Sequence, residues 1–145
     1  MVKVETPNHW YSVEWDKDGR PVLWVIGEGK YSPKEAIAVI RVAVDMVTSG
    51  PFDHVCSVYN VLRCQIPFLG RFLGQGSVPT SSRTAHIIVG THSNAIRLLA
   101  SMIAVTANKR LRTMEVCITD EEVENSVNKW LAMPDRARTY TINDV

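Results

Sequence analysis

The sequence predicts an α/β fold, and three observations support that prediction. Short apolar runs such as residues 54–59 and 85–89 are rich in β-branched residues and have the length of buried strands. Longer segments such as 94–107 carry an apolar stripe at helical spacing and alternate with those runs. The connections are short, as in βαβ units, whose strands are parallel. We therefore expect a single mixed, mostly parallel, five-stranded sheet with four helices, in the order β-β-α-β-α-β-α-β-α.

The first elements are a β-hairpin and a helix. Apolar residues alternate over 11–15, and the turn-forming residues 16–21 separate them from the apolar run 22–27. Ser32 can cap a helix, and Pro33 suits a first helical position, so a helix is expected to begin there. Its apolar stripe ends at the following Gly-Pro pair, which terminates helices.

The second half of the chain alternates strands and helices. Ser93 is the expected cap of one helix, and a capping box at Thr119 to Glu122 opens the last one. The expected elements are strands at 54–59, 85–89 and 114–118, and helices at 66–74, at 94–107 and from Thr119.

The length of the chain indicates one domain. With 145 residues, of which 46% are hydrophobic, the chain can bury a substantial core. We expect one domain over residues 1–145, with its core over 11–131. Residues 132–145 lack clear periodicity and are expected to be a C-terminal extension.

Composition excludes several classes of protein. A net charge of +1 argues against a nucleic-acid binder, and no stretch approaches the ~20 apolar residues of a membrane span. The odd number of cysteines, without a Cys-x-x-Cys pair, argues against a disulfide scaffold or a zinc site. The glycines at 27 and 29 do not complete a nucleotide-binding motif. We expect a soluble cytoplasmic protein without metal or cofactor.

Positive charge is concentrated in the middle of the chain. Between Asp53 and Glu115 there is no acidic residue. Such asymmetry can form a positive surface that attracts phosphates, lipid headgroups or an acidic partner. The alternative is that these basic side chains pair with acidic residues of the flanking segments. The basic residues of this region are Arg63, Arg71, Arg83, Arg97, Lys109, Arg110 and Arg112.

Two expected loops, 60–63 and 90–94, follow neighbouring strands. The 90–94 loop precedes a helix, where free backbone N–H groups can bind an anion. Both loops are expected at the carboxyl edge of the sheet, where ligands bind in open α/β folds. The candidate binding residues are therefore Asn60, Arg63, His92, Ser93 and, for its added charge, Arg97, although Ser93 can equally serve only as a helix cap.

The order of elements and these residues together resemble the STAS domain, the sulfate-transporter and anti-sigma-factor-antagonist fold, grouped with lipid-binding SEC14-like domains. The resemblance covers about residues 11–131 and rests on the hairpin, the central strand 55–60 and the segments at 66–73, 85–99 and 119–131.

The resemblance carries implications for individual residues. Members that act as phosphoswitches have Asp-Ser-Ser-Gly at the helix after the central strand. Aligned on Gly70, this chain has Phe68 at the serine position, and Asn60 replaces the aspartate that often ends the central strand. For a SEC14-like domain, Phe68 and Phe72 would line an apolar ligand cavity; the alternative is that they are buried in the core.

These observations favour a noncatalytic regulatory or ligand-binding domain without the phosphoserine switch. Its partner would be another protein or a small apolar or anionic ligand. One alternative is an enzyme or redox sensor that uses Cys64 or His92. Another is a structural subunit that forms a homodimer.

Overall fold

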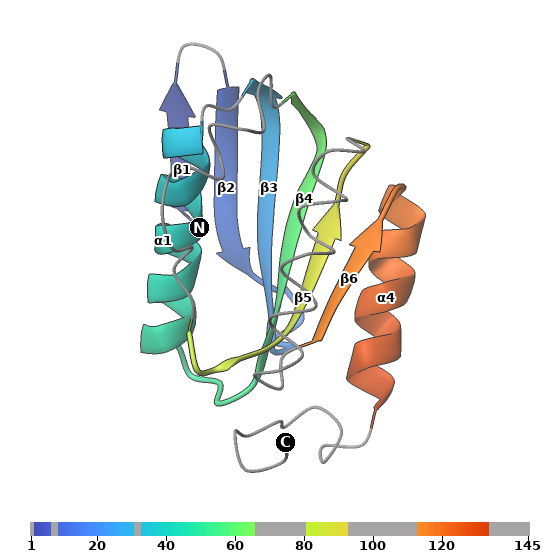
Figure 1. Ribbon diagram of the computed structural model, residues 1–145. Helices are drawn as coiled ribbons and strands as arrows, with labels where there is room; N and C mark the ends of the chain where they lie inside the picture. The colour runs from blue at the N-terminus through green and yellow to red at the C-terminus, as the bar shows by residue number, and fades with distance from the viewer. Residues whose placement is uncertain (1, 7–8, 31–32, 66–80, 93–112, 134–145) are drawn as a thin grey trace.

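Six strands form one mixed sheet in the computed structural model, which describes residues 2–6, 9–30, 33–65, 81–92 and 113–133 (Figure 1). The strands lie side by side in sequence order. The elements are β1 (Val2–Thr6), β2 (His9–Trp15), β3 (Val22–Lys30), α1 (Pro33–Ser49), β4 (Val55–Gln65), β5 (Thr84–Gly90), β6 (Thr113–Cys117) and α4 (Asp120–Ala132).

The α/β class and the strand directions agree with the sequence. β2 and β3 form the expected antiparallel hairpin, and β3, α1 and β4 form a βαβ unit with parallel strands. β5 and β6 continue the parallel part of the sheet. The helices expected to begin at Ser32-Pro33 and at Thr119 are found as α1, between β3 and β4, and α4, after β6. Those expected at 66–74 and 94–107 lie outside the described residues.

The expected number of five strands is wrong, because β1 adds a sixth. It pairs antiparallel with β2, so that Lys3 lies opposite Ser12 and Glu5 opposite Trp10. β1 has only 5 residues and mixes charged with apolar side chains, which obscures its strand pattern. Charged side chains are common on edge strands, because they discourage pairing with another sheet.

The expected loop at residues 60–63 is also wrong, because β4 continues to Gln65. Ile26 of β3 pairs with Asn60, but Glu28 pairs with Arg63, so β4 contains one extra residue between these pairs. Side chains normally alternate between the two faces, and a β-bulge of one residue shifts that alternation. Arg63 therefore lies on the same face of the sheet as Asn60.

The two described helices cover opposite faces and different halves of the sheet. Leu23 and Val25 of β3 pack in a cluster with α1, whereas their neighbour Val22 packs in a cluster with α4. α1 contacts β2 and β3, and α4 contacts β4, β5 and β6 (Figure 1). On the α4 side, the cluster with α4 includes Val22 and the partly buried Trp24 of β3 but no residue of β2.

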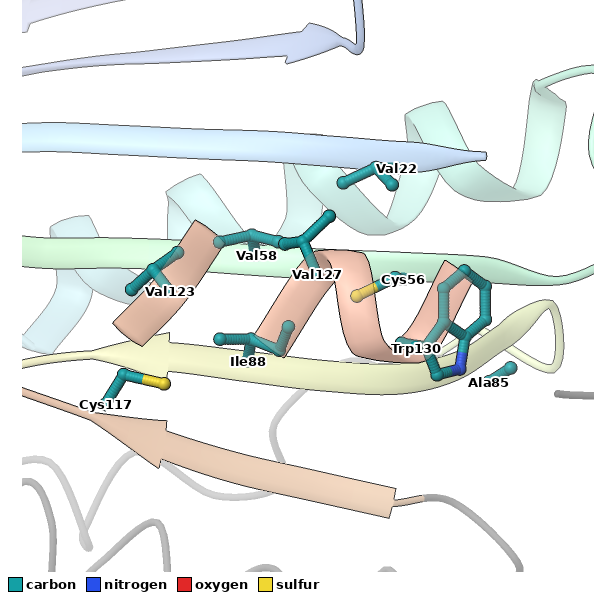
Figure 2. Close-up of a cluster of buried hydrophobic side chains, with 9 residues drawn as sticks. All are labelled: Val22, Cys56, Val58, Ala85, Ile88, Cys117, Val123, Val127 and Trp130. Atoms are coloured by element: carbon teal, nitrogen blue, oxygen red, sulfur yellow. The ribbon is translucent and has the colours of Figure 1, made fainter. Parts of the chain in front are cut away.

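The α4 side of the sheet has a compact core. Val123, Val127 and Trp130 of α4 point toward side chains from four strands, β3 to β6 (Figure 2). Thr119 caps the helix, as expected, because its Oγ1 accepts a hydrogen bond of 3.1 Å from the backbone N–H of Glu122. The Glu122 carboxylate in turn accepts one of 2.8 Å from the N–H of Ile118, which completes a variant of the capping box.

Neither α1 nor α4 has the length and apolar character that would let it cross a membrane.

Candidate functional site

A groove of about 560 Å³ lies between α4 and the face of β2 and β3 on the α4 side of the sheet, and we call it the β2–α4 groove. Trp10 and Trp24 come from the two strands and Val123 from the helix. Trp10 lies opposite Glu28 in the antiparallel register, and Trp24 lies opposite Glu14 four pairs further along. Because side chains alternate between the two faces, an even number of pairs places Trp10 and Trp24 on the same face. Volumes of this size are typical of ligand sites.

One end of the groove is held by Asp16 in the β2–β3 turn. Its carboxylate accepts hydrogen bonds from Nε and Nη2 of Arg20 at 2.9 and 2.8 Å and from Nε1 of Trp24 at 2.9 Å. The Arg20 hydrogen bonds are the main cause that holds the pKa of Asp16 well below its usual range, and they outweigh the opposing effect of burial. Arg20 also donates from Nη1 to Oδ1 of Asn128 at 3.3 Å, which connects the turn to α4.

The other end is held by Asp120 at the start of α4. Nδ2 of Asn60 donates to Oδ1 of Asp120 at 2.8 Å, and Nη2 of Arg63 donates to Oδ2 at 2.6 Å. These hydrogen bonds lower the pKa of Asp120, and the bond from Asn60 has the largest effect. His92 adds a smaller electrostatic contribution in the same direction. The ends of β4 and β5 and the first turn of α4 therefore meet here, at the carboxyl edge of the parallel strands.

The structure brings together three of the candidate residues named from the sequence. Asn60 and Arg63 share Asp120 as partner, and His92 lies within electrostatic range of it. Ser93 and the other three candidates, Phe68, Phe72 and Arg97, lie outside the described residues.

For Arg63, pairing with an acidic residue of a flanking segment is the correct alternative. Its guanidinium forms a salt bridge with Asp120, although both side chains are about half exposed. Arg83 likewise has a structural contact, since its Nη1 donates to the backbone oxygen of Gly50 at 3.0 Å. Both guanidinium groups are therefore already bound within the protein, and neither is a free cation for an anionic ligand.

The groove is negatively charged. Among the described residues, six carboxylates line it against three basic side chains, so the charge of this lining is opposite to that expected for a surface around Arg63. The acidic residues are Glu14, Asp16, Asp18, Glu28, Asp120 and Glu124, and the basic residues are Lys17, Arg20 and Arg63.

Sequence reasoning missed the two tryptophans and the two carboxylates that hold the groove. Trp10 and Trp24 alternate with the core residues of β2 and β3. Aromatic residues at the outward positions of an amphipathic strand are the signal that could have identified this face. The sequence predicts Asp120 only as part of a capping box. Its contact with Asn60 of β4 joins residues that are far apart in the sequence, so no local pattern indicates it.

The cysteines lie away from the groove lining. Burial raises the pKa of the Cys56 and Cys117 thiols, which disfavours their thiolates. Cys64 lies in β4 and packs against the core on the α1 side. Among the described residues, no group of three or more His, Cys, Asp or Glu side chains is arranged to hold a metal ion.

Comparison of the chain with known protein families, with curated proteins and with solved structures finds no match.

Proposed function

We propose that this chain is a noncatalytic, STAS-like binding domain and that the β2–α4 groove is its binding site. The observation that carries the proposal is the construction of the groove. Trp10, Trp24 and Ile26, which are only partly buried, form an apolar lining between two hydrogen-bonded clusters, at Asp16 and at Asp120. A preformed cleft with apolar walls and a few fixed polar groups is typical of a ligand site.

The state of the two carboxylates supports binding rather than acid–base catalysis. A general acid or base works best when its pKa lies near the working pH. The pKa values of Asp16 and Asp120 are instead lowered by their hydrogen-bond donors. Both groups therefore stay ionised and serve to fix the walls of the groove.

The resemblance to STAS domains supports a regulatory role. Phe68 takes the position of the phosphorylated serine, so we expect the domain to act without that switch. The same resemblance leads us to propose helices at 66–74 and 94–107, in addition to α1 and α4. Cys56, Cys64 and Cys117 form no disulfide, which fits a reducing cytoplasm.

Nuclear magnetic resonance with small probes tests the proposal. Neutral aromatic, anionic and cationic fragments are titrated into ¹⁵N-labelled protein. We expect at least one class to shift the indole signals of Trp10 and Trp24 and the backbone amide of Asn60. The amide of Arg41, on the exposed side of α1, is the internal control and should not move. The proposal is wrong if no fragment shifts the groove signals, or if all shifts fall on the α1 side.

The two alternatives are tested with the same protein. An enzyme or redox sensor that uses Cys64 or His92 should lose its activity in Cys64→Ser or His92→Gln, whereas groove binding should persist. A purely structural homodimer should show a dimer in analytical ultracentrifugation and no fragment binding in the groove.

A further inference from the structure

We infer that the β2–α4 groove binds a basic segment of a partner protein, with Lys or Arg side chains lying on its tryptophans and among its carboxylates. This inference rests on the proposed function, because it names the class of partner for the same groove. It also departs from the anionic ligand that was one of the partners expected from the sequence, since the charge of the described lining is negative.

The first support is the excess of carboxylates in the groove. Arg20 and Arg63 are already hydrogen-bonded to Asp16 and Asp120. Lys17 is the remaining basic side chain among the described residues of the lining. Four further lining carboxylates form no ion pair within the part of the chain that the structure describes: Glu14, Asp18, Glu28 and Glu124. A ligand with several positive charges would neutralise this excess.

The second support is the crowding of these carboxylates around the two arginines. The hydrogen bond to Asp16 is the largest cause that raises the pKa of Arg20, and the charges of Asp18 and Glu124 raise it further. In the same way, the hydrogen bond to Asp120 is the largest cause that raises the pKa of Arg63, and the charge of Glu28 raises it further. Each guanidinium thus has more negative neighbours than it can neutralise, so a net negative potential remains at both ends of the groove.

The third support is an ammonium group that the chain itself places on this surface. Nζ of Lys3 lies 5.5 Å from the ring centroid of Trp10, and it also forms a salt bridge of 3.1 Å with Glu5. An indole and a carboxylate together hold the cation, a combination that binds Lys and Arg side chains well. Trp24 offers a second indole, whose orientation is fixed by the hydrogen bond to Asp16.

The distribution of charge favours a peptide segment over a small amine. The unpaired carboxylates come from β2, the β2–β3 turn, β3 and α4, so they lie along both walls of the groove. One ammonium group can approach only part of this set. A segment that alternates basic and apolar residues can place its cations along the walls and its apolar side chains on the partly buried Ile26.

Calorimetric titration with defined peptides tests the inference. The probe is a nine-residue peptide in which Lys and Leu alternate, and its counterpart has Glu in place of Lys. We expect the Lys peptide to bind, to weaken as salt is raised and to shift the Trp10 and Trp24 indole signals. The Glu peptide should not bind.

A triple variant, Glu14→Gln, Glu28→Gln and Glu124→Gln, removes three unpaired carboxylates of the groove. Because exposed charge pairs each contribute little, we expect affinity for the Lys peptide to fall about tenfold. The matched control is Asp45→Asn, Asp53→Asn and Glu121→Gln, which changes the net charge equally at exposed positions outside the groove. Its affinity should stay within about twofold of the wild-type value.

Each other outcome overturns the inference in a distinct way. Equal loss in both triple variants means that the peptide responds only to net charge. Spermidine binding as tightly as the Lys peptide means that the ligand is a polyamine. Groove shifts with neutral or anionic fragments but not with the Lys peptide refute the basic partner and leave the proposed function intact. If no probe of any charge binds the groove, both fail.

Discussion

The Asp16 carboxylate and the Arg20 guanidinium form a two-point contact within a single turn, with Nε and Nη2 donating at 2.9 and 2.8 Å. The Asp16 side chain is only 6% exposed, whereas that of Arg20 is 32% exposed. Because Asp16 also accepts the indole N–H of Trp24, this one carboxylate fixes both the turn and a wall of the groove. Stability and binding geometry therefore depend on the same group.

The first prediction is that Asp16→Asn destabilises the protein in a pH-dependent way. Removing the charge leaves Arg20 partly buried without its partner, so we expect a loss of about 2–3 kcal/mol at pH 7. The pKa of Asp16 is lowered in the folded state, so its contribution is fully present above the unfolded pKa of about 3.9 and is lost as pH falls through the folded pKa. Urea unfolding at pH 7 and pH 3 measures the difference between variant and wild type.

Asp18→Asn is the matched control for this measurement. Asp18 lies in the same turn, but it is exposed and its own carboxylate makes no hydrogen bond or ion pair within the described residues. We expect its effect to stay below about 0.5 kcal/mol at both pH values. A gap between Asp16→Asn and wild type that stays constant with pH would contradict the role given to the Asp16 charge.

The second prediction compares the two groups that hold Asp120. Asn60 is buried, and its Oδ1 also accepts a 3.2 Å hydrogen bond from the N–H of Leu62 at the β4 bulge. Asn60→Leu leaves that part-buried N–H without its acceptor and removes the buried amide that holds Asp120, so it should cost about 1–3 kcal/mol. Arg63→Gln removes a half-exposed salt bridge and should cost less than about 1 kcal/mol. Thermal and urea unfolding measure both, and a larger loss for Arg63→Gln would refute this ranking.

The elements that the sequence predicts correctly are those with strong local signals. The β2–β3 hairpin has alternating apolar residues on either side of a turn that contains Gly19, and the backbone φ of Gly19 is 76°. α4 has its capping box at Thr119. In both cases, residues close in sequence determine the conformation.

The missed features depend on contacts that are distant in sequence. β1 is too short to be recognised without β2, against which it pairs. The continuation of β4 to Gln65 depends on its pairing with Glu28 to Lys30 of β3, because polar residues in this stretch resemble a loop. The charge of the groove could not be predicted either, since Arg63 meets Asp120 across 57 positions of sequence.

The third prediction concerns two glycines with different roles. A Cβ at Gly50 would clash with Cζ2 of Trp15 and would lie 2.7 Å from the backbone oxygen of Met46, so either the ring or the end of α1 must move. We expect Gly50→Ala to cost about 2–3 kcal/mol through overpacking. A Cβ at Gly19 meets nothing within 4 Å, so Gly19→Ala should cost only the strain of its left-handed backbone, about 1 kcal/mol.

Gly19→Asn separates backbone strain from packing, because asparagine tolerates the left-handed region better than alanine. Its unfolding midpoint in urea should therefore lie between those of wild type and Gly19→Ala. If Gly19→Ala is more destabilising than Gly50→Ala, the close contact at the end of α1 is not the dominant cost.

The fourth prediction concerns the thiols and decides between a binding domain and a redox sensor. Iodoacetamide reacts with thiolates, and burial raises the pKa of Cys56 and Cys117. In the native protein at pH 7 we expect both to be alkylated at least about tenfold more slowly than in urea, as followed by mass spectrometry. Cys64 packs against the α1-side core, so we expect it to react more slowly than free glutathione. A Cys64 that reacts faster than glutathione would instead favour the redox sensor, because only an activated thiolate gains that advantage over a free thiol.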